Sequence, residues 1–187
     1  MEHPSLTMQS ILENMSDLYE AGLFTGQEHT SAKTCVRQIP AAFKKIDWVP
    51  GTINLDYGGG KYDDASDYLR LFARVSNVVF DPFNRSQKRN GKVLELLKAR
   101  KADSATICNV LNVIKESVVR QGVLLRVKRL VKYGCPVYIS VYRGRGNTPT
   151  LTSRGWQENR PLATYLDEVK QVFRDAEIKN NMIIARN

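Results

Sequence analysis

The chain contains 187 residues, of which 28 are Lys or Arg and 19 are Asp or Glu, giving a formal net charge of +9. Hydrophobic residues make up 42% and charged residues 25%, which is typical of a folded globular domain and excludes disordered, collagenous and disulfide-rich chains. Three cysteines without C-x-x-C spacing predict small buried side chains in a reducing compartment. The lack of a long apolar run and of a signal-peptide pattern predicts a cytoplasmic protein with no membrane partner.

Residues 1–49 are predicted to form a helical extension that acts as a lid. Apolar side chains recur at three- and four-residue spacings over residues 5–22, which predicts an amphipathic helix that ends at Gly22. A second helix is expected over residues 30–46, with Pro40 at its start or at a bend. Residues 50–187 form the main unit, so the chain is predicted to be a single domain.

From Thr52 onward, strand patterns alternate with helix patterns. Apolar runs typical of strands begin residues 52–60, 77–83, 103–114 and 136–144, and helical spacing occupies residues 64–75, 85–102, 117–134 and 161–173. Residues 176–187 predict two short strands around an Asn180–Asn181 turn. This order predicts an α/β fold, an open twisted sheet that is mostly parallel, with a C-terminal antiparallel hairpin and helices on both faces.

Candidate binding residues follow the predicted strands, because open parallel sheets bind ligands at the carboxyl ends of their strands. Asp56, Tyr57 and the glycines Gly58, Gly59 and Gly60 follow the first strand, and Asp81 ends the second. Three glycines allow a ligand to approach the backbone closely, and a carboxylate at the second strand accepts hydrogen bonds from ribose hydroxyls. The pattern predicts a site for a nucleoside-containing ligand.

The residues after the glycines argue against two common phosphate sites. A dinucleotide site needs G-x-G-x-x-G at a helix start, and a phosphate loop needs G-x-x-x-x-G-K-[ST]. The chain instead has GGGKYDDASDY, in which Asp63, Asp64 and Asp67 would repel phosphate. These acids are interpreted as helix N-terminal residues rather than metal ligands. The ligand is therefore expected to be a cationic or neutral nucleoside.

These motifs resemble class I S-adenosylmethionine-dependent methyltransferases. LDYGGG is similar to their D-x-G-x-G motif, VVFDP to their acidic second motif, and SATICNVLNVI to the strand that faces the methyl donor. The resemblance implies a Rossmann-like fold that lacks one edge strand here, since only one helix fits between Asp81 and Ser104. It also implies S-adenosyl-L-methionine as cofactor, with Asp103 or Ser104 near the adenine. The implied cofactor-binding residues are Asp56, Tyr57, Gly58, Gly59, Gly60, Asp81, Pro82 and Asn109.

The sequence does not identify the methyl acceptor. Asn109 and Asn112 are the candidate catalytic residues, since an amide can orient an acceptor, but NVLN lacks the D/N-P-P-Y/F and Pro-Cys motifs of DNA methyltransferases. Residues 156–160 combine a stacking surface with fixed donors, so the candidate substrate-binding residues are Trp156, Gln157, Asn159 and Arg160. Residues 143–155 are expected to form a mobile, basic, substrate-gripping loop.

Other interpretations remain beside the methyltransferase. The glycines alone also fit a tight strand-to-helix turn without a ligand. The net charge of +9 and basic runs in residues 85–101 and 126–160 favour RNA or DNA as a partner through basic faces, or else solvated helix surfaces. A nucleic-acid-binding module with a degenerate methyltransferase fold, or an enzyme that cleaves the same cofactor, also fits. His3 and His29 lack metal-ligand spacing, so no metal is expected.

Overall fold

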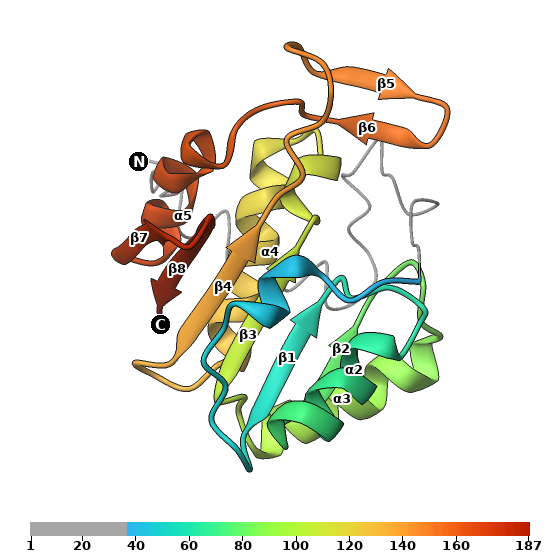
Figure 1. The fold of residues 1–187 in the computed structure, drawn as a ribbon, viewed down its shortest axis with the longest axis vertical. Coiled ribbons are helices and arrows are strands. Elements are labelled where there is room, and N and C mark those ends of the chain that lie inside the picture. Colours follow the sequence, from blue (N-terminus) through green and yellow to red (C-terminus); the bar gives the residue numbers. More distant parts are fainter. Residues whose placement is uncertain (1–36) are drawn as a thin grey trace, which may run out of the picture.

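The computed structural model describes residues 37–187, and the helix expected over residues 5–22 lies outside this range. Six strands form one sheet in the order β2-β1-β3-β4-β8-β7 (Figure 1). Their bounds are β1 (Ile53–Tyr57), β2 (Ser76–Phe80), β3 (Ser104–Cys108), β4 (Pro136–Ser140), β7 (Asp175–Lys179) and β8 (Met182–Arg186). The first four are parallel, and β8 runs antiparallel between β4 and β7. The predicted α/β fold is confirmed. Among the described residues, β2 forms one edge of the sheet.

Helices cover both faces of this sheet (Figure 1). One face packs against α3 (Gln87–Ala99), α4 (Ser117–Leu130) and α5 (Leu166–Val172), the last of which follows the 3-10 turn η5 (Leu162–Tyr165). The other face packs against α2 (Asp64–Tyr68), the π-helical turn η3 (Leu69–Ala73) and the 3-10 turn η2 (Ala41–Lys44). No helix within residues 37–187 combines the length and the apolar character needed to cross a membrane.

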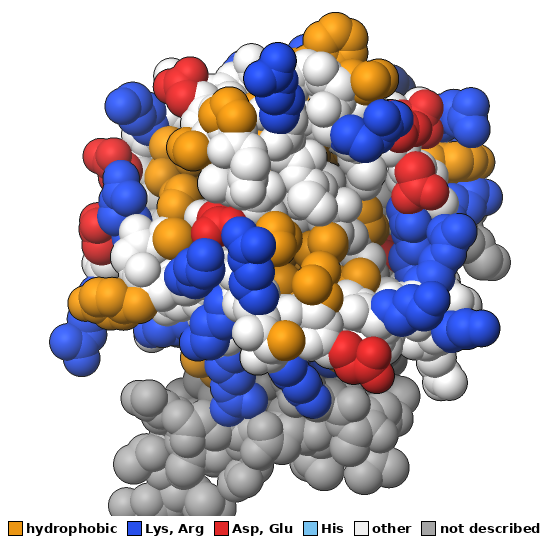
Figure 2. Space-filling model, turned by 90° about the horizontal axis from the view of Figure 1, so that it is seen from below, with side chains coloured by type: hydrophobic (Ala, Val, Ile, Leu, Met, Phe, Trp, Pro, Cys, Tyr) orange, Lys and Arg blue, Asp and Glu red, His pale blue; other side chains and the backbone are white. Residues whose placement is uncertain are grey.

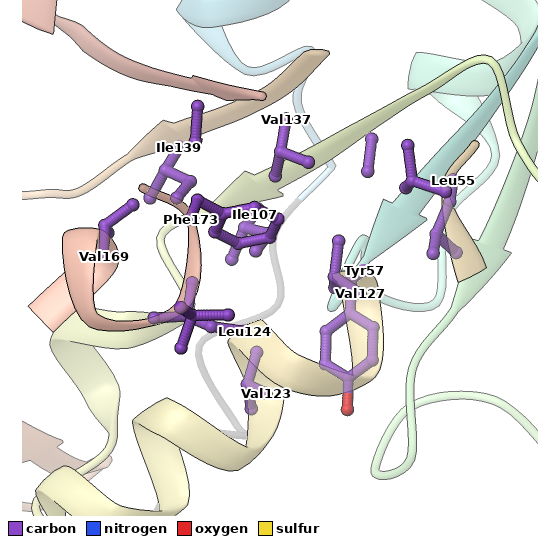
Figure 3. Packing of buried hydrophobic residues seen from close by; sticks show 14 of the residues in the cluster. Leu55, Tyr57, Ile107, Val123, Leu124, Val127, Val137, Ile139, Val169 and Phe173 are labelled. Carbon is purple, nitrogen blue, oxygen red and sulfur yellow. The ribbon is translucent and has the colours of Figure 1, made fainter. Parts of the chain in front are cut away.

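The main core lies between the sheet and the helices α3, α4 and α5. Leu55, Ile107 and Ile139 project from three neighbouring strands onto α4 and α5 and are fully buried (Figure 3). Burying a side chain of this size contributes roughly 1.5–3 kcal/mol, so the strands are held firmly in register. Because side chains alternate along a strand, Asn54 and Asp56 point away from this core toward the face of α2. The hydrophobic packing thereby fixes where the strands end.

Two segments differ from the sequence predictions. The helix expected over residues 30–46 is wrong in its described part, where the chain makes only the short turn η2 after Pro40. Phe43 in this turn is fully buried against Ala65 and Leu69, so the segment packs onto the sheet. The loop expected over residues 143–155 holds a small antiparallel hairpin, formed by β5 (Thr150–Thr152) and β6 (Gly155–Gln157).

The C-terminal hairpin is as predicted. Asn180 and Asn181 connect β7 to β8 with φ values of 54° and 61°, and both therefore adopt the left-handed conformation of a type I′ turn. Asparagine tolerates this conformation better than most residues do. The turn lies beside η2, where Lys45 Nζ donates a hydrogen bond to the Asn180 carbonyl at 3.4 Å.

Candidate active site

The glycine turn after β1 lies where the strand order reverses, because β2 pairs with one side of β1 and β3 with the other. The N–H of Gly58 donates to the Phe80 carbonyl at 2.7 Å, which ties the turn to the end of β2. Gly58 and Gly60 have φ values of +77° and +76°, in the left-handed region that favours glycine. A Cβ at Gly58 would lie 2.4 Å from Val110 Cγ2, so close packing as well as φ requires a glycine there.

Asp81 joins the second strand end to this turn. The residue is 3% exposed, and its Oδ2 accepts the N–H of Gly60 at 2.9 Å. Its Oδ1 accepts the N–H groups of Phe83 and Asn84, each at 2.9 Å. The structure therefore brings Gly60 and Asp81 together, as the shared edge of parallel strands predicts. Pro82 follows as an exposed residue at the rim.

Asn84 and Arg85 complete this corner and were missed as site residues by the sequence analysis. Asn84 Nδ2 lies 3.2 Å from both carboxylate oxygens of Asp81. Arg85 donates from Nε to the Gly60 carbonyl at 2.6 Å and from Nη2 to the Tyr62 carbonyl at 2.9 Å, and its Nη1 pairs with Asp63 at 2.7 Å. Arg85 therefore clamps the loop after the glycines. Its position directly after DPFN was the available signal, but the basic run hid it.

Asp56 is buried behind the glycine turn, in a polar network between β1, β2 and β3. Its oxygens accept hydrogen bonds from Thr106 Oγ1 at 3.0 Å and Asn77 Nδ2 at 3.4 Å. Burial raises the pKa of Asp56 from 3.8 to about 6, although these hydrogen bonds oppose the shift. Tyr57 differs, since its ring packs on Phe80 in the main core with centroids 5.1 Å apart. Only the backbone of Tyr57 lies at the turn.

A cavity of about 510 Å³ lies on the other side of β3, at the carboxyl ends of β3 and β4. Three predicted site residues line it, namely Asn109, Asn112 and Gln157. Asn109 has a φ of 59° and donates its N–H to the Ser140 carbonyl at 2.8 Å, which fixes it between the two strand ends. Because the next residue, Val110, packs on Gly58, Asn109 lies between the cavity and the glycine turn.

No family model matches the chain, and no curated protein sequence matches it. Among solved structures, PigF, determined with SAH, matches with a TM-score of 0.53 and 12% sequence identity, over 95% of this chain and 60% of that chain. The chain has the class I methyltransferase fold. Phosphoethanolamine N-methyltransferase 2 of Haemonchus contortus, determined with S-adenosyl-L-methionine, matches with a TM-score of 0.49 and 17% identity, over 94% of this chain and 44% of that chain. The chain thus spans less than two thirds of either protein.

Three residues expected to bind substrate make contacts within the chain. Asn159 Nδ2 donates to the Thr148 carbonyl at 2.8 Å. Arg160 Nη2 pairs with Glu168 at 2.6 Å, and its guanidinium lies 3.8 Å from the ring centroid of Tyr165. Trp156 Nε1 donates to a carboxylate oxygen of Glu158 at 2.8 Å. These three residues brace the segment after β6, and of the predicted set only Gln157 lines the cavity.

Asp103 and Ser104 lie at the amino end of β3, away from the glycine turn. Asp103 accepts the N–H of Ile53 at 2.9 Å and pairs with Lys132, which together lower the pKa of Asp103 although burial opposes the shift. Ser104 donates to Asn54 Oδ1 at 2.9 Å. The expectation that either residue lies near the adenine does not agree with a nucleoside bound at the glycine turn, because that turn and Asp81 lie at the opposite, carboxyl ends of the strands.

Part of the predicted basic surface has a structural role. Arg126 is 4% exposed and lies 4.6 Å from the Phe80 ring centroid, and Lys128 Nζ donates to the Val172 carbonyl at 2.7 Å. The cations of α3 are exposed. Figure 2 shows blue Lys and Arg side chains at several places around one face, with red acidic side chains between them. The positive charge on that face is therefore distributed rather than gathered into one patch.

Cysteine and metal chemistry receive no support from residues 37–187. Cys108 and Cys135 are free, and burial raises the pKa of Cys108 to about 12, helped by the charge of Asp56. A thiol with such a pKa is a poor nucleophile, in line with the packing role predicted for it. No group of three or more His, Cys, Asp or Glu residues in that range could hold a metal ion, and His3 and His29 lie outside it.

Proposed function

We propose that this chain is an S-adenosylmethionine-dependent methyltransferase. The observation that carries the proposal is the joining of the glycine turn to Asp81 at the switch point of a class I methyltransferase fold. In this proposal Asp81 binds the ribose hydroxyls. The backbone of residues 57–60 lines the methionine end of the cofactor, and Pro82 and Asn109 flank it.

The hydrogen bonds of Asp81 fit this ligand. Backbone N–H groups of Gly60, Phe83 and Asn84 fix the orientation of the carboxylate. The other partner of the carboxylate is the side-chain amide of Asn84, in the loop after β2. Its Nδ2 lies 3.2 Å from both carboxylate oxygens. Two vicinal ribose hydroxyls present donors to the same two oxygens. A ribose can therefore replace one side-chain amide without loss of the backbone hydrogen bonds that hold the turn.

The cofactor supplies an electrophilic methyl group on a sulfonium sulfur. The protein has to hold the acceptor in line with that group, and positioning alone supplies roughly 7–11 kcal/mol of a barrier. Asn109 lies between the glycine turn and the cavity, where its amide can orient an acceptor. Asn112 lines the same cavity and is the second candidate for that role.

Asp56 sets the electrostatics behind the turn. A carboxylate with a pKa of about 6 is mostly ionised at neutral pH, and it then favours the ammonium and sulfonium charges of the cofactor. Burial makes this charge costly in the absence of a cationic ligand. Cofactor binding therefore compensates an unfavourable buried charge.

Calorimetric titration of the full chain with S-adenosylmethionine tests the proposal. We expect Asp81→Ala to weaken binding at least about tenfold, because two hydrogen bonds to a charged acceptor are lost. The matched control is Asp67→Ala, which removes an exposed acid paired only with Arg70 among the described residues. Equal affinities for wild type and Asp81→Ala would show that the cofactor site is misplaced, and absence of binding would favour a non-enzymatic fold.

A further inference from the structure

We propose that the cavity beside Asn109 binds the methyl acceptor, and that this acceptor is a nucleotide, either free or within a single strand. The proposal rests on the methyltransferase function proposed above. At about 510 Å³ the cavity lies within the range of small-ligand pockets and has room for one nucleotide rather than a folded partner. Asn109 separates it from the glycine turn, so a bound acceptor lies next to the proposed methyl donor.

The lining is unusually rich in amide side chains. They come from four segments that are far apart in the sequence, at the six positions Gln38, Asn109, Asn112, Gln157, Asn180 and Asn181. An amide offers both donors and an acceptor, which matches the mixed donor and acceptor edges of nucleobases. Proteins recognise loops and single strands of nucleic acids through such base edges.

Asn112 provides an unsatisfied group in this lining. It is 2% exposed, and its Nδ2 lies 3.4 Å from Gln157 Oε1, whereas its Oδ1 has no partner within residues 37–187. A buried acceptor without a donor costs about 1–3 kcal/mol in general, so such groups usually have a ligand or water. A ring or exocyclic N–H of a base supplies the missing donor.

The charge of the cavity favours an anion. Lys45 at the end of η2 and Arg154 in the β5–β6 turn both line it, and no Asp or Glu within residues 37–187 does. Neither cation has a carboxylate partner within the described chain. Tyr142 also lines the cavity and is 52% exposed, which leaves a ring available for a base to stack on. Two cations, one ring and six amides correspond to the phosphate, the face and the edge of a nucleotide.

Binding measurements on the full chain test this assignment. The probes are the four common nucleoside monophosphates, their nucleosides, citrate as an anion without a base, and short single-stranded RNA and DNA, each with and without S-adenosylhomocysteine. We expect at least one nucleotide to bind about tenfold more tightly than both its nucleoside and citrate. Tighter binding of the monophosphate or of the strand then identifies the source of the nucleotide.

Matched variants locate the site. Lys45→Ala/Arg154→Ala is expected to weaken nucleotide binding about tenfold, whereas Lys44→Ala/Arg145→Ala, which removes the same charge outside the cavity lining, leaves it unchanged. Asn112→Ala is expected to weaken the nucleoside and the nucleotide alike. Equal losses in both double variants, or no preference over citrate, would overturn the proposal. S-adenosylmethionine is titrated separately, so failure of the cofactor to bind refutes the proposed function, and failure of nucleotides alone refutes this inference.

Discussion

Gly59 shows how closely the turn after β1 is packed. A Cβ at this position would lie 2.3 Å from Asp56 Oδ2 and 2.9 Å from Val79 Cγ1. Asp56 cannot move easily, because Thr106 and Asn77 hold its carboxylate in a buried network. The glycine is therefore required for packing, independently of any ligand.

We expect Gly59→Ala to lower the free energy of unfolding by about 1–3 kcal/mol, as overpacking commonly does. Gly122→Ala is the matched control, because its Cβ meets nothing within 4 Å on helix α4. There the better helix propensity of alanine should add about 0.5–1 kcal/mol. Denaturant unfolding measures both, and a neutral Gly59→Ala variant would contradict the geometry of the turn.

Asp56 should make stability depend on pH. Because the folded state holds its proton up to about pH 6 and the unfolded state releases it near 3.8, the contribution of Asp56 to stability falls as pH rises through this window. We expect the free energy of unfolding of Asp56→Asn to rise by about 2 kcal/mol relative to wild type between pH 4 and pH 7. The control Asp175→Asn changes an exposed acid. If plots of the free energy of unfolding against pH are parallel for wild type and Asp56→Asn, the pKa of Asp56 is not raised.

Asn84 should compete with the cofactor. Its amide bridges both oxygens of Asp81, and a ribose must displace it. We expect Asn84→Ala to tighten S-adenosylmethionine binding by a few fold, measured by calorimetry, because the internal partner is removed. Weaker binding in this variant would mean that Asn84 contacts the cofactor, rather than occupying the Asp81 oxygens only when the cofactor is absent.

Helices α4 and α5 are joined by a buried ion-pair cluster. Arg120 is 5% exposed and contacts Glu168 through Nε at 2.8 Å and Nη2 at 2.9 Å, and its Nη1 donates to the Ile114 carbonyl at 2.8 Å. Burial alone would raise the pKa of Glu168, but Arg120 and Arg160 hold it below its ordinary value. The cluster fixes the segment that follows β6, which begins directly after Gln157 in the cavity wall.

Arg120→Met should therefore destabilise the fold by about 3–5 kcal/mol, because it leaves buried carboxylates without their main partner. Arg70→Met provides the comparison, since it breaks an exposed pair with Asp67 that is worth at most about 1 kcal/mol. Thermal and denaturant unfolding of the two variants measure the difference. Similar small losses in both would show that the cluster is not tightly coupled.

The order of strands and helices could be predicted because each is short and periodic. Residues Leu55 and Ile107 mark buried strands, and the Asn180–Asn181 pair marks the hairpin. The hairpin of β5 and β6 could not be predicted, since both of its strands are only three residues long and no residue of β5 is buried. The segment of η2 was predicted to belong to a longer helix because the apolar spacing continues past Pro40. In the structure Pro40 is the N-cap of a short turn.

The site as a whole was predictable only where topology decides it. Gly60 and Asp81 meet because parallel strands end at one edge, a relation that spacing in the sequence indicates. The clamp by Arg85 and the cavity between η2, β6 and the β7–β8 turn depend on long-range packing, which no local pattern encodes. For the same reason, Arg126 and Arg160 were assigned to a basic surface, although Arg126 is buried against Phe80 and Arg160 pairs with Glu168.

A crystal structure of the full chain with S-adenosylhomocysteine tests the proposed cofactor site most directly. We expect the ribose hydroxyls to lie within hydrogen-bond distance of both Asp81 oxygens, the nucleoside to rest against the backbone of Gly58 and Gly60, and the Asn84 amide to have moved away. Electron density for the ligand at any other place on the molecule, or no density at saturating ligand, would contradict the proposed cofactor site.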